Sequence, residues 1–488
     1  MRLLLTVLLA FHTLSLYAQF NWEYYFSQLI AENQKVPETG VAISLFRSSE
    51  VLLQKGWGLA DRNQKRAVTK DTLFSLGSTT KAFTALALAD LQSRGEVQLQ
   101  STIRSVLSDF QLSDEWMTNN VSIEDALSHR SGLPRHDLMW YWSDLSGDEI
   151  YERMRFLDFV PQARQQFRQL YNYNNLMYMV AGRVIEEVSG ESWERVIRSR
   201  LTEPLRMDNT YFSFDQMREQ SDYALPYYGE REISFHEIVS IAPAGSIVSS
   251  VADMAKWGQL YLRRGMSTLY NRVVSEESIA NVWNPRVKMM ADQELYYGLG
   301  WVVRPHPSGV VWYFHNGNID GFSAFIMVAP DFDLGLVIFT NQNNSELPGL
   351  IAQSLLKKLL KEREEKQVVV QERPHFFWML PFKQINMSLM GMPQLMIDVI
   401  QDEVVGEFEH PAYGKLLFEK EGEQLYLSYY QHRWPVQIVE KYLVAHALIY
   451  GVEKVQIPFE MTWVDGKVVK LSAPLESKVA PIGFLRKR

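Results

Sequence analysis

Phe74-Ser75-Leu76-Gly77-Ser78-Thr79-Thr80-Lys81-Ala82-Phe83 leads into an apolar run that stops near Gly95. The run is apolar nearly all round, so we expect it to form a helix that is buried in its domain. Ser78 and Lys81 are three residues apart and therefore share one face of that helix. A helix N-terminus also favours negative charge on the serine oxygen. The segment thus predicts a serine nucleophile with a lysine amine within reach.

The same Ser-x-x-Lys spacing occurs a second time, at Ser354-Leu355-Leu356-Lys357. This copy lies inside an amphipathic pattern followed by a run of charges, which is typical of a solvated helix face. Ser78, by contrast, follows Gly77, where the backbone can turn sharply and bring helical N–H groups close to a ligand. We therefore assign the nucleophile to Ser78 and a surface position to Ser354.

Two further segments carry polar groups suited to a catalytic site. Tyr173-Asn174-Asn175 places a phenol and an amide two positions apart, directly before an apolar helical run. His315-Asn316-Gly317-Asn318 follows a strand-like run, and Gly317 permits a close backbone approach. Taken singly, Tyr173 is more often a packing residue and His315 a structural histidine. Their order along one chain, after Ser-x-x-Lys, is far less expected by accident.

With these three motifs the chain resembles the β-lactamase-related serine hydrolases. That family includes class C β-lactamases, penicillin-binding carboxypeptidases, D-aminopeptidases and family VIII esterases. Residues 122–134 look like the family's LL-x-H-x-SGLP segment, and residues 242–250 look like its P-A-G-G-L-x-S-T turn. The resemblance covers residues 25–360. It implies an α+β fold of the β-lactamase/transpeptidase type, in which helices flank an antiparallel sheet.

The resemblance also implies a role for each motif residue. Ser78 is expected to form the acyl-enzyme. Lys81 and Tyr173 are treated as one coupled base, because each must lose roughly three units from a pKa of about 10 to work near neutrality. Which of the two accepts the proton stays open. The expected substrate-binding residues are Asn175, His315, Gly317 and Asn318. Of these, Asn175 would also orient the Lys81 amine, and the backbone N–H groups of Ser78 and Asn318 would form the oxyanion hole.

His315 marks the main departure from true β-lactamases, which carry a lysine at this place. A histidine is neutral much of the time at pH 7, so it attracts the carboxylate of an antibiotic less strongly. We therefore expect hydrolysis of a small peptide, amide or ester, of the D-amino-acid peptidase or carboxypeptidase kind. A carboxylesterase of the same fold and a catalytically silent sensor of the penicillin-binding type are the alternatives.

Composition limits the classes of partner. The chain has 488 residues, of which 47% are hydrophobic and 22% charged, as in globular proteins. A net charge of −8 argues against a nucleic-acid partner. Ten scattered histidines and no cysteine predict neither a metal site nor a cofactor. The expected partner is a small molecule or peptide substrate, and the oligomeric state stays open.

The first 18 residues resemble a signal peptide. Arg2 precedes an apolar stretch from Leu3 to Leu16, which is followed by Leu16-Tyr17-Ala18. The stretch is too short to span a bilayer comfortably, so we expect cleavage rather than anchoring and no membrane contact beyond export. The expected location is the bacterial periplasm or the medium. Absence of cysteine is compatible with such export but fits the cytosol equally well.

Two predicted hairpins fix the organisation of the long first domain. Residues 41–46 and 51–53 form one, residues 322–328 and 334–339 form the other, and strands from both ends should share one sheet. We place this domain at residues 19–366 and an apolar, methionine-rich linker at 367–402. A lid or a membrane-contact segment is the alternative for that stretch. Short strands across residues 403–488 indicate a small all-β domain, which resembles the lipocalin-like domain appended to many of these hydrolases.

Overall fold

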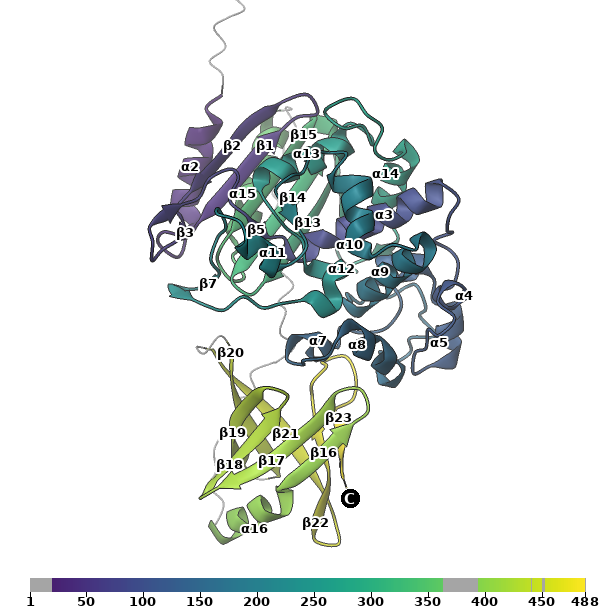
Figure 1. The fold of residues 1–488 in the computed structure, drawn as a ribbon, viewed down its shortest axis with the longest axis vertical. Helices are drawn as coiled ribbons and strands as arrows, with labels where there is room; N and C mark the ends of the chain where they lie inside the picture. Colours follow the sequence, from purple (N-terminus) through teal and green to yellow (C-terminus); the bar gives the residue numbers. More distant parts are fainter. Residues whose placement is uncertain (1–19, 363–393, 440, 450–452, 488) are drawn as a thin grey trace, which may run out of the picture.

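The computed structural model describes residues 20–362, 394–439, 441–449 and 453–487. They form a large sheet-and-helix part and a smaller barrel beneath it (Figure 1). Within these ranges, no helix combines the length and the apolar character needed to cross a bilayer. The expected signal peptide, residues 1–18, lies outside the described residues.

The larger part is built on one antiparallel sheet of eight strands. Its order is β10-β11-β12-β13-β14-β15-β1-β2. The strands are β10 (Val287–Lys288), β11 (Tyr296–Tyr297), β12 (Val302–Pro305), β13 (Val311–Ile319), β14 (Phe322–Ala329), β15 (Leu334–Thr340), β1 (Val41–Phe46) and β2 (Val51–Trp57). β1 pairs with β15, so strands from both ends of the domain do share one sheet. Both predicted hairpins and the α+β class are confirmed.

Helices cover both faces of this sheet. In β15 all seven residues are buried, and alternate side chains enter different cores. Val337 and Phe339 face the side of α3 (Lys81–Ser93) and α13 (Val251–Leu262), whereas Leu336 and Ile338 face α2 (Trp22–Asn33) and α15 (Leu347–Glu362). This alternation is the period of two that a strand imposes. α3 is buried along its first eleven residues, as its apolar sequence predicts.

Between the two hairpins the chain consists mostly of helices and loops, with short strands. The helices are α4 (Ile103–Val106), α5 (Glu115–Asn120), α6 (Ile123–Leu127), α7 (Leu138–Tyr141), α8 (Gly147–Arg153), α9 (Leu176–Ser189), α10 (Trp193–Ile197), α11 (Phe214–Arg218), α12 (Ala242–Gly245) and α14 (Glu276–Trp283). The short strands are β3 (Leu59–Asp61), β4 (Arg66–Ala67), β5 (Phe74–Ser75), β6 (Thr210–Tyr211), β7 (Tyr227–Tyr228), β8 (Arg231–Glu232) and β9 (Val248–Ser249).

The C-terminal part is a closed barrel of eight antiparallel strands. They are β16 (Gly406–His410), β17 (Gly414–Glu421), β18 (Gln424–Tyr429), β19 (His432–Val439), β20 (Tyr442–Ile449), β21 (Glu453–Val464), β22 (Lys467–Ala473) and β23 (Ile482–Arg486). β16 pairs with β23 and closes the ladder. Buried and exposed residues alternate over most of β17, as expected for a strand with one face inside a barrel. The all-β prediction is confirmed.

One helix precedes the barrel. α16 (Gln394–Val404) packs against β17 and β22, so the compact C-terminal unit begins before residue 403. It occupies the end of the stretch that we expected to be a linker. The preceding residues of that stretch, up to 393, lie outside the described part of the chain.

Candidate active site

Ser78 is held in a tight turn between β5 and α3. The turn is a short 3₁₀ segment, η2 (Gly77–Thr80), which lies against β13. Gly77 has a φ of +49°, and a Cβ atom there would lie 3.0 Å from Asn318 N. A Cβ atom at Gly317 would lie 1.9 Å from the Leu76 carbonyl oxygen. Because η2 and β13 approach so closely, both positions require glycine. Packing against the turn that carries Ser78 therefore explains the glycine at position 317.

The backbone groups next to Ser78 come from this same contact. β12 pairs with β13 only up to the Val302–Phe314 pair, whereas β14 pairs with β13 as far as Ile319. The free edge of β13 beyond Phe314 faces η2, and a Cβ atom at Gly317 would lie only 3.0 Å from Ser78 N. The structure therefore brings the backbone of Ser78 and of Asn318 together, as an oxyanion hole requires.

Lys81 is the first residue of α3, and its side chain is fully buried. Its Nζ lies 3.2 Å from Ser78 Oγ, 2.8 Å from Asn175 Oδ1 and 2.8 Å from the Ala244 carbonyl oxygen. Burial, reinforced by the positive charge of Arg135, holds the pKa of Lys81 well below its usual range. A neutral amine has two N–H groups, which Asn175 and Ala244 accept, and its lone pair then faces the Ser78 hydroxyl. This is the geometry of a general base.

Asn175 links Lys81 to a charged pair. Its Nδ2 donates to Asp137 Oδ1 over 3.0 Å, while its Oδ1 accepts from Lys81. Asp137 also accepts from Trp140 Nε1 at 2.8 Å and forms an ion pair with Arg135. Both polar groups of the Asn175 amide are therefore engaged within the protein. The expected contact with Lys81 is present. Because an amide nitrogen carries two hydrogens, the bond to Asp137 leaves a second donor on Nδ2, and the substrate contact of Asn175 stays a prediction.

Tyr173 lies among rings and cations. Its ring centroid is 4.2 Å from that of His129, 4.8 Å from Lys81 Nζ and 4.9 Å from the Arg135 guanidinium carbon. Burial raises the pKa of Tyr173 above its ordinary value, although Arg135 and a hydrogen bond with Ser78 act in the opposite direction. The phenol therefore favours its protonated form. Because the pKa of Lys81 is lowered and that of Tyr173 is raised, the amine is the better candidate for the base.

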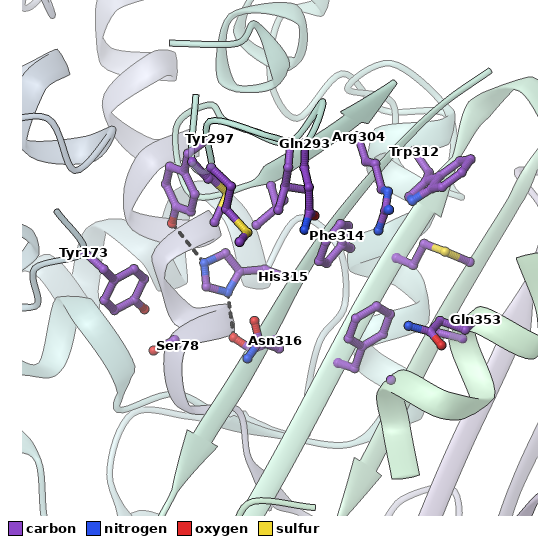
Figure 2. A pocket seen from close by; sticks show the side chains of 18 of the residues that line it. Ser78, Tyr173, Gln293, Tyr297, Arg304, Trp312, Phe314, His315, Asn316 and Gln353 are labelled. Carbon is purple, nitrogen blue, oxygen red and sulfur yellow. Dashed lines mark hydrogen bonds between the residues drawn. The ribbon is translucent and has the colours of Figure 1, made fainter. Parts of the chain in front are cut away.

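His315 is buried on β13, and both of its ring nitrogens have partners in the protein (Figure 2). Nδ1 is 2.7 Å from the Asn316 carbonyl oxygen, which can only accept, so this nitrogen carries the hydrogen. Nε2 then accepts from the Tyr297 hydroxyl at 2.9 Å. Burial, followed by the charge of Lys81, lowers the pKa of His315 to about 3. The ring is thus neutral and bonds to Tyr297, which lines the same cavity as Ser78.

A cavity of about 160 Å³ extends from the nucleophile along the sheet. In Figure 2, Ser78 and Tyr173 lie at one end, His315 in the middle, and Trp312 and Gln353 at the other end. Its lining also contains many apolar side chains, which are Met289, Leu295, Trp312, Phe314, Phe325, Met327, Ala352 and Leu356. The sequence did not predict this extension, because its walls come from the loop after β10, from three strands and from α15.

The sequence also missed three side chains that support the motif residues. Arg135 and Asp137 directly follow the segment that looks like the family's SGLP motif, and Tyr297 holds His315. Adjacent charges of opposite sign are usually a surface pair, so composition alone gave no signal. For Arg135 and Asp137, the position just after a motif was the only clue.

Comparisons with known proteins find relatives over most of the chain. The model of the Beta-lactamase family matches residues 26–358. An unguisins hydrolase of Aspergillus campestris is 31% identical over 79% of this chain and 76% of its own length. The protein flp of Staphylococcus aureus is 25% identical over 65% of this chain and 62% of its own length.

Solved structures share the fold over nearly the whole chain. The octameric penicillin-binding protein homologue from Pyrococcus abyssi has a TM-score of 0.60 at 22% identity and covers 95% of this chain and 99% of its own. SurE, solved with D-Leu, has a TM-score of 0.54 at 19% identity, and the match covers 95% of this chain and 98% of the SurE chain. The family model spans more than half of the sequence, and two relatives are named hydrolases. The chain therefore belongs to the β-lactamase family and is a hydrolase of that family.

Proposed function

We propose that the protein is a serine hydrolase that forms an acyl-enzyme on Ser78. One observation carries the proposal: the buried Lys81 amine has acceptors for two N–H groups at 2.8 Å and meets Ser78 Oγ at 3.2 Å. A structural lysine has no need for a lowered pKa or for a serine hydroxyl opposite its lone pair. Lys81 acts as the base in this proposal, and Tyr173 works beside it.

The reaction begins when Ser78 Oγ attacks the substrate carbonyl carbon while its proton passes to Lys81 Nζ. The carbonyl oxygen becomes an oxyanion, which the N–H groups of Ser78 and Asn318 stabilise. The bond to the leaving group then breaks, and that group takes the proton from Lys81 through the Tyr173 phenol. A water molecule attacks the acyl-enzyme in the same manner, gives its proton back to Ser78 Oγ and releases the acid.

The substrate in this proposal is a small peptide, amide or ester, and we favour a D-amino-acid peptidase or carboxypeptidase-like activity. The relative from Aspergillus campestris is named for hydrolysis of unguisins. A carboxylesterase of the same fold is the second candidate, because the apolar lining of the cavity suits an acyl chain. Ala352 is part of that lining. Ala352→Phe should therefore shorten the preferred acyl chain and lower kcat/KM for long esters about fivefold relative to acetate.

Efficient β-lactam hydrolysis is not part of the proposal. With its pKa lowered to about 3, His315 supplies no fixed cation for the carboxylate of an antibiotic. The alternative from another functional class is a catalytically silent sensor, and any turnover that depends on Ser78 would exclude it.

The test is a substrate panel with wild type and Ser78→Ala. D-alanyl peptides, D-amino acid amides, p-nitrophenyl esters and nitrocefin separate the candidate activities. A fluorophosphonate probe reports the nucleophile directly. We expect wild type to be labelled and to hydrolyse a member of the panel, and Ser78→Ala to do neither. Undiminished labelling of Ser78→Ala would overturn the assignment.

A further inference from the structure

The segment Arg135-His136-Asp137 connects the active site to the barrel. Arg135 lies over the ring of Tyr173, and Asp137 holds Asn175, which in turn holds Lys81. His136 between them has a φ of +47°, a left-handed conformation that is unfavourable for a non-glycine residue. Such a conformation persists only where surrounding groups enforce it.

The barrel supplies two of the groups that hold His136. Its backbone N–H donates to Glu476 Oε2 over 3.0 Å, and Glu476 is itself buried. Its Nδ1 accepts from the Tyr413 hydroxyl at 2.8 Å, because Nε2 donates to the Asp158 carbonyl oxygen at 2.8 Å. Every polar atom of the His136 ring and its N–H thus has a partner, and the N–H depends on the barrel.

A second hydrogen bond from the same barrel loop reaches the segment that carries Tyr173. Residues 474–481 connect β22 to β23 and carry both Glu476 and Lys478. Lys478 Nζ donates to Asn172 Oδ1 over 2.8 Å, one residue before Tyr173. Figure 1 shows the barrel lying below α7 and α8, the region next to these contacts.

We propose that Glu476 is a positioning residue for the active site, assisted by Lys478, so that the barrel sets the geometry of Lys81 and Tyr173. The inference rests on the proposed Ser78 mechanism. Without the Glu476 carboxylate, the buried N–H of His136 has no acceptor, and relaxing its left-handed backbone moves Arg135 and Asp137. Asn175 then loses its anchor, and Lys81 loses its alignment with Ser78. Misplacement by about 1 Å is enough to reduce catalysis by about 100-fold.

The test compares Glu476→Ala and Glu476→Gln in the full-length protein. Glutamine keeps an oxygen acceptor for the His136 N–H, whereas alanine removes it. We expect Glu476→Ala to lower kcat for a p-nitrophenyl ester by about tenfold or more, with KM changed less than about twofold. Fluorophosphonate labelling of Ser78 should slow in parallel. Glu476→Gln should recover kcat to within about threefold of wild type.

A matched control removes an interface bond away from the site. Arg153 of α8 donates a hydrogen bond to the hydroxyl oxygen of Tyr430 in the barrel over 3.3 Å. Tyr430→Phe removes this bond and should leave kcat and labelling unchanged. If Glu476→Ala does not fold, Lys478→Met is the variant that tests the inference, and its kcat should fall about threefold. A wild-type kcat in the variant used for the test would overturn the inference. Equal losses of kcat in Glu476→Ala and Tyr430→Phe would overturn it as well. Failure of wild type to label would instead refute the Ser78 mechanism.

Discussion

The chain contains two copies of Ser-x-x-Lys, and only one has the buried setting on which the proposed mechanism depends. Ser78 and Lys81 lie at the start of α3, where Lys81 is fully buried and contacts Asn175 and Ala244, 94 and 163 residues away in sequence. Ser354 and Lys357 lie in the middle of α15, and Lys357 is exposed. The tetrapeptide fixes only the distance between hydroxyl and amine. Long-range packing determines whether that amine is available as a base.

The largest effect that separates the two copies is loss of the hydroxyl. Ser78→Ala should lower hydrolysis by at least about 10⁴-fold, because no acyl-enzyme can form. Ser354→Ala is the matched control and should retain wild-type activity. Active-site labelling and steady-state rates measure both. Equal activity of the two variants would remove the distinction between the copies.

Loss of the amine comes next. Lys81→Met should reduce labelling of Ser78 by about 10³-fold while the fold is kept, since methionine fills a similar volume without a buried amine. Lys357→Met, on the exposed face of α15, should change neither labelling nor thermal stability. If Lys81→Met were labelled at the wild-type rate, Tyr173 would have to be the base.

Close contact between η2 and β13 has no counterpart at the second copy. Gly317→Ala should cost about 100-fold in labelling, because its Cβ atom would lie 1.9 Å from the Leu76 carbonyl oxygen and push the oxyanion site apart. Gly422→Ala provides the comparison, since a Cβ atom at this barrel position meets nothing within 4 Å. Its left-handed φ of +60° should lower stability by about 1 kcal/mol and leave labelling intact.

The smallest expected effect is a dependence of labelling on pH, which follows from the lowered pKa of Lys81. Labelling should rise about tenfold per pH unit while Lys81 loses its proton, and level off well below pH 10.5, the ordinary value for lysine. Above that lowered pKa and up to about pH 10.5, the unfolded chain binds a proton that the folded chain has released, so the free energy of unfolding should rise with pH. Lys81→Met should abolish that rise. Chemical unfolding at several pH values measures it, and labelling that climbs only near pH 10.5 would contradict the shift.

Local patterns were enough to predict much of the fold. The runs at residues 41–46 and 334–339 are apolar, short and bounded by turns, so they were predicted as strands. The segments of β19, β20 and β21 were not singled out as strands. β19 contains Pro435, which counts against a strand in sequence.

The candidate site was predictable in its motifs but not in its energetics. Ser78, Lys81, Tyr173 and His315 all lie along one cavity or beside it, as their order suggested. The burial of Lys81 and the paired nitrogens of His315 follow from contacts that span the chain. Sequence spacing carries no information about which carbonyl oxygen, such as that of Ala244, will face an amine.

Pairing of β1 with β15 has a consequence for how the chain is made. Val41 lies opposite Thr340, so roughly 300 residues must be synthesised before β1 gains its second neighbour, which takes about 15 to 60 s at ribosomal speed. All six residues of β1 are buried in the finished sheet. During that interval an apolar strand edge is open to any other nascent chain, which is a recognised cause of aggregation. Yield in a foreign host should therefore depend on translation rate and on chaperones that cover such edges.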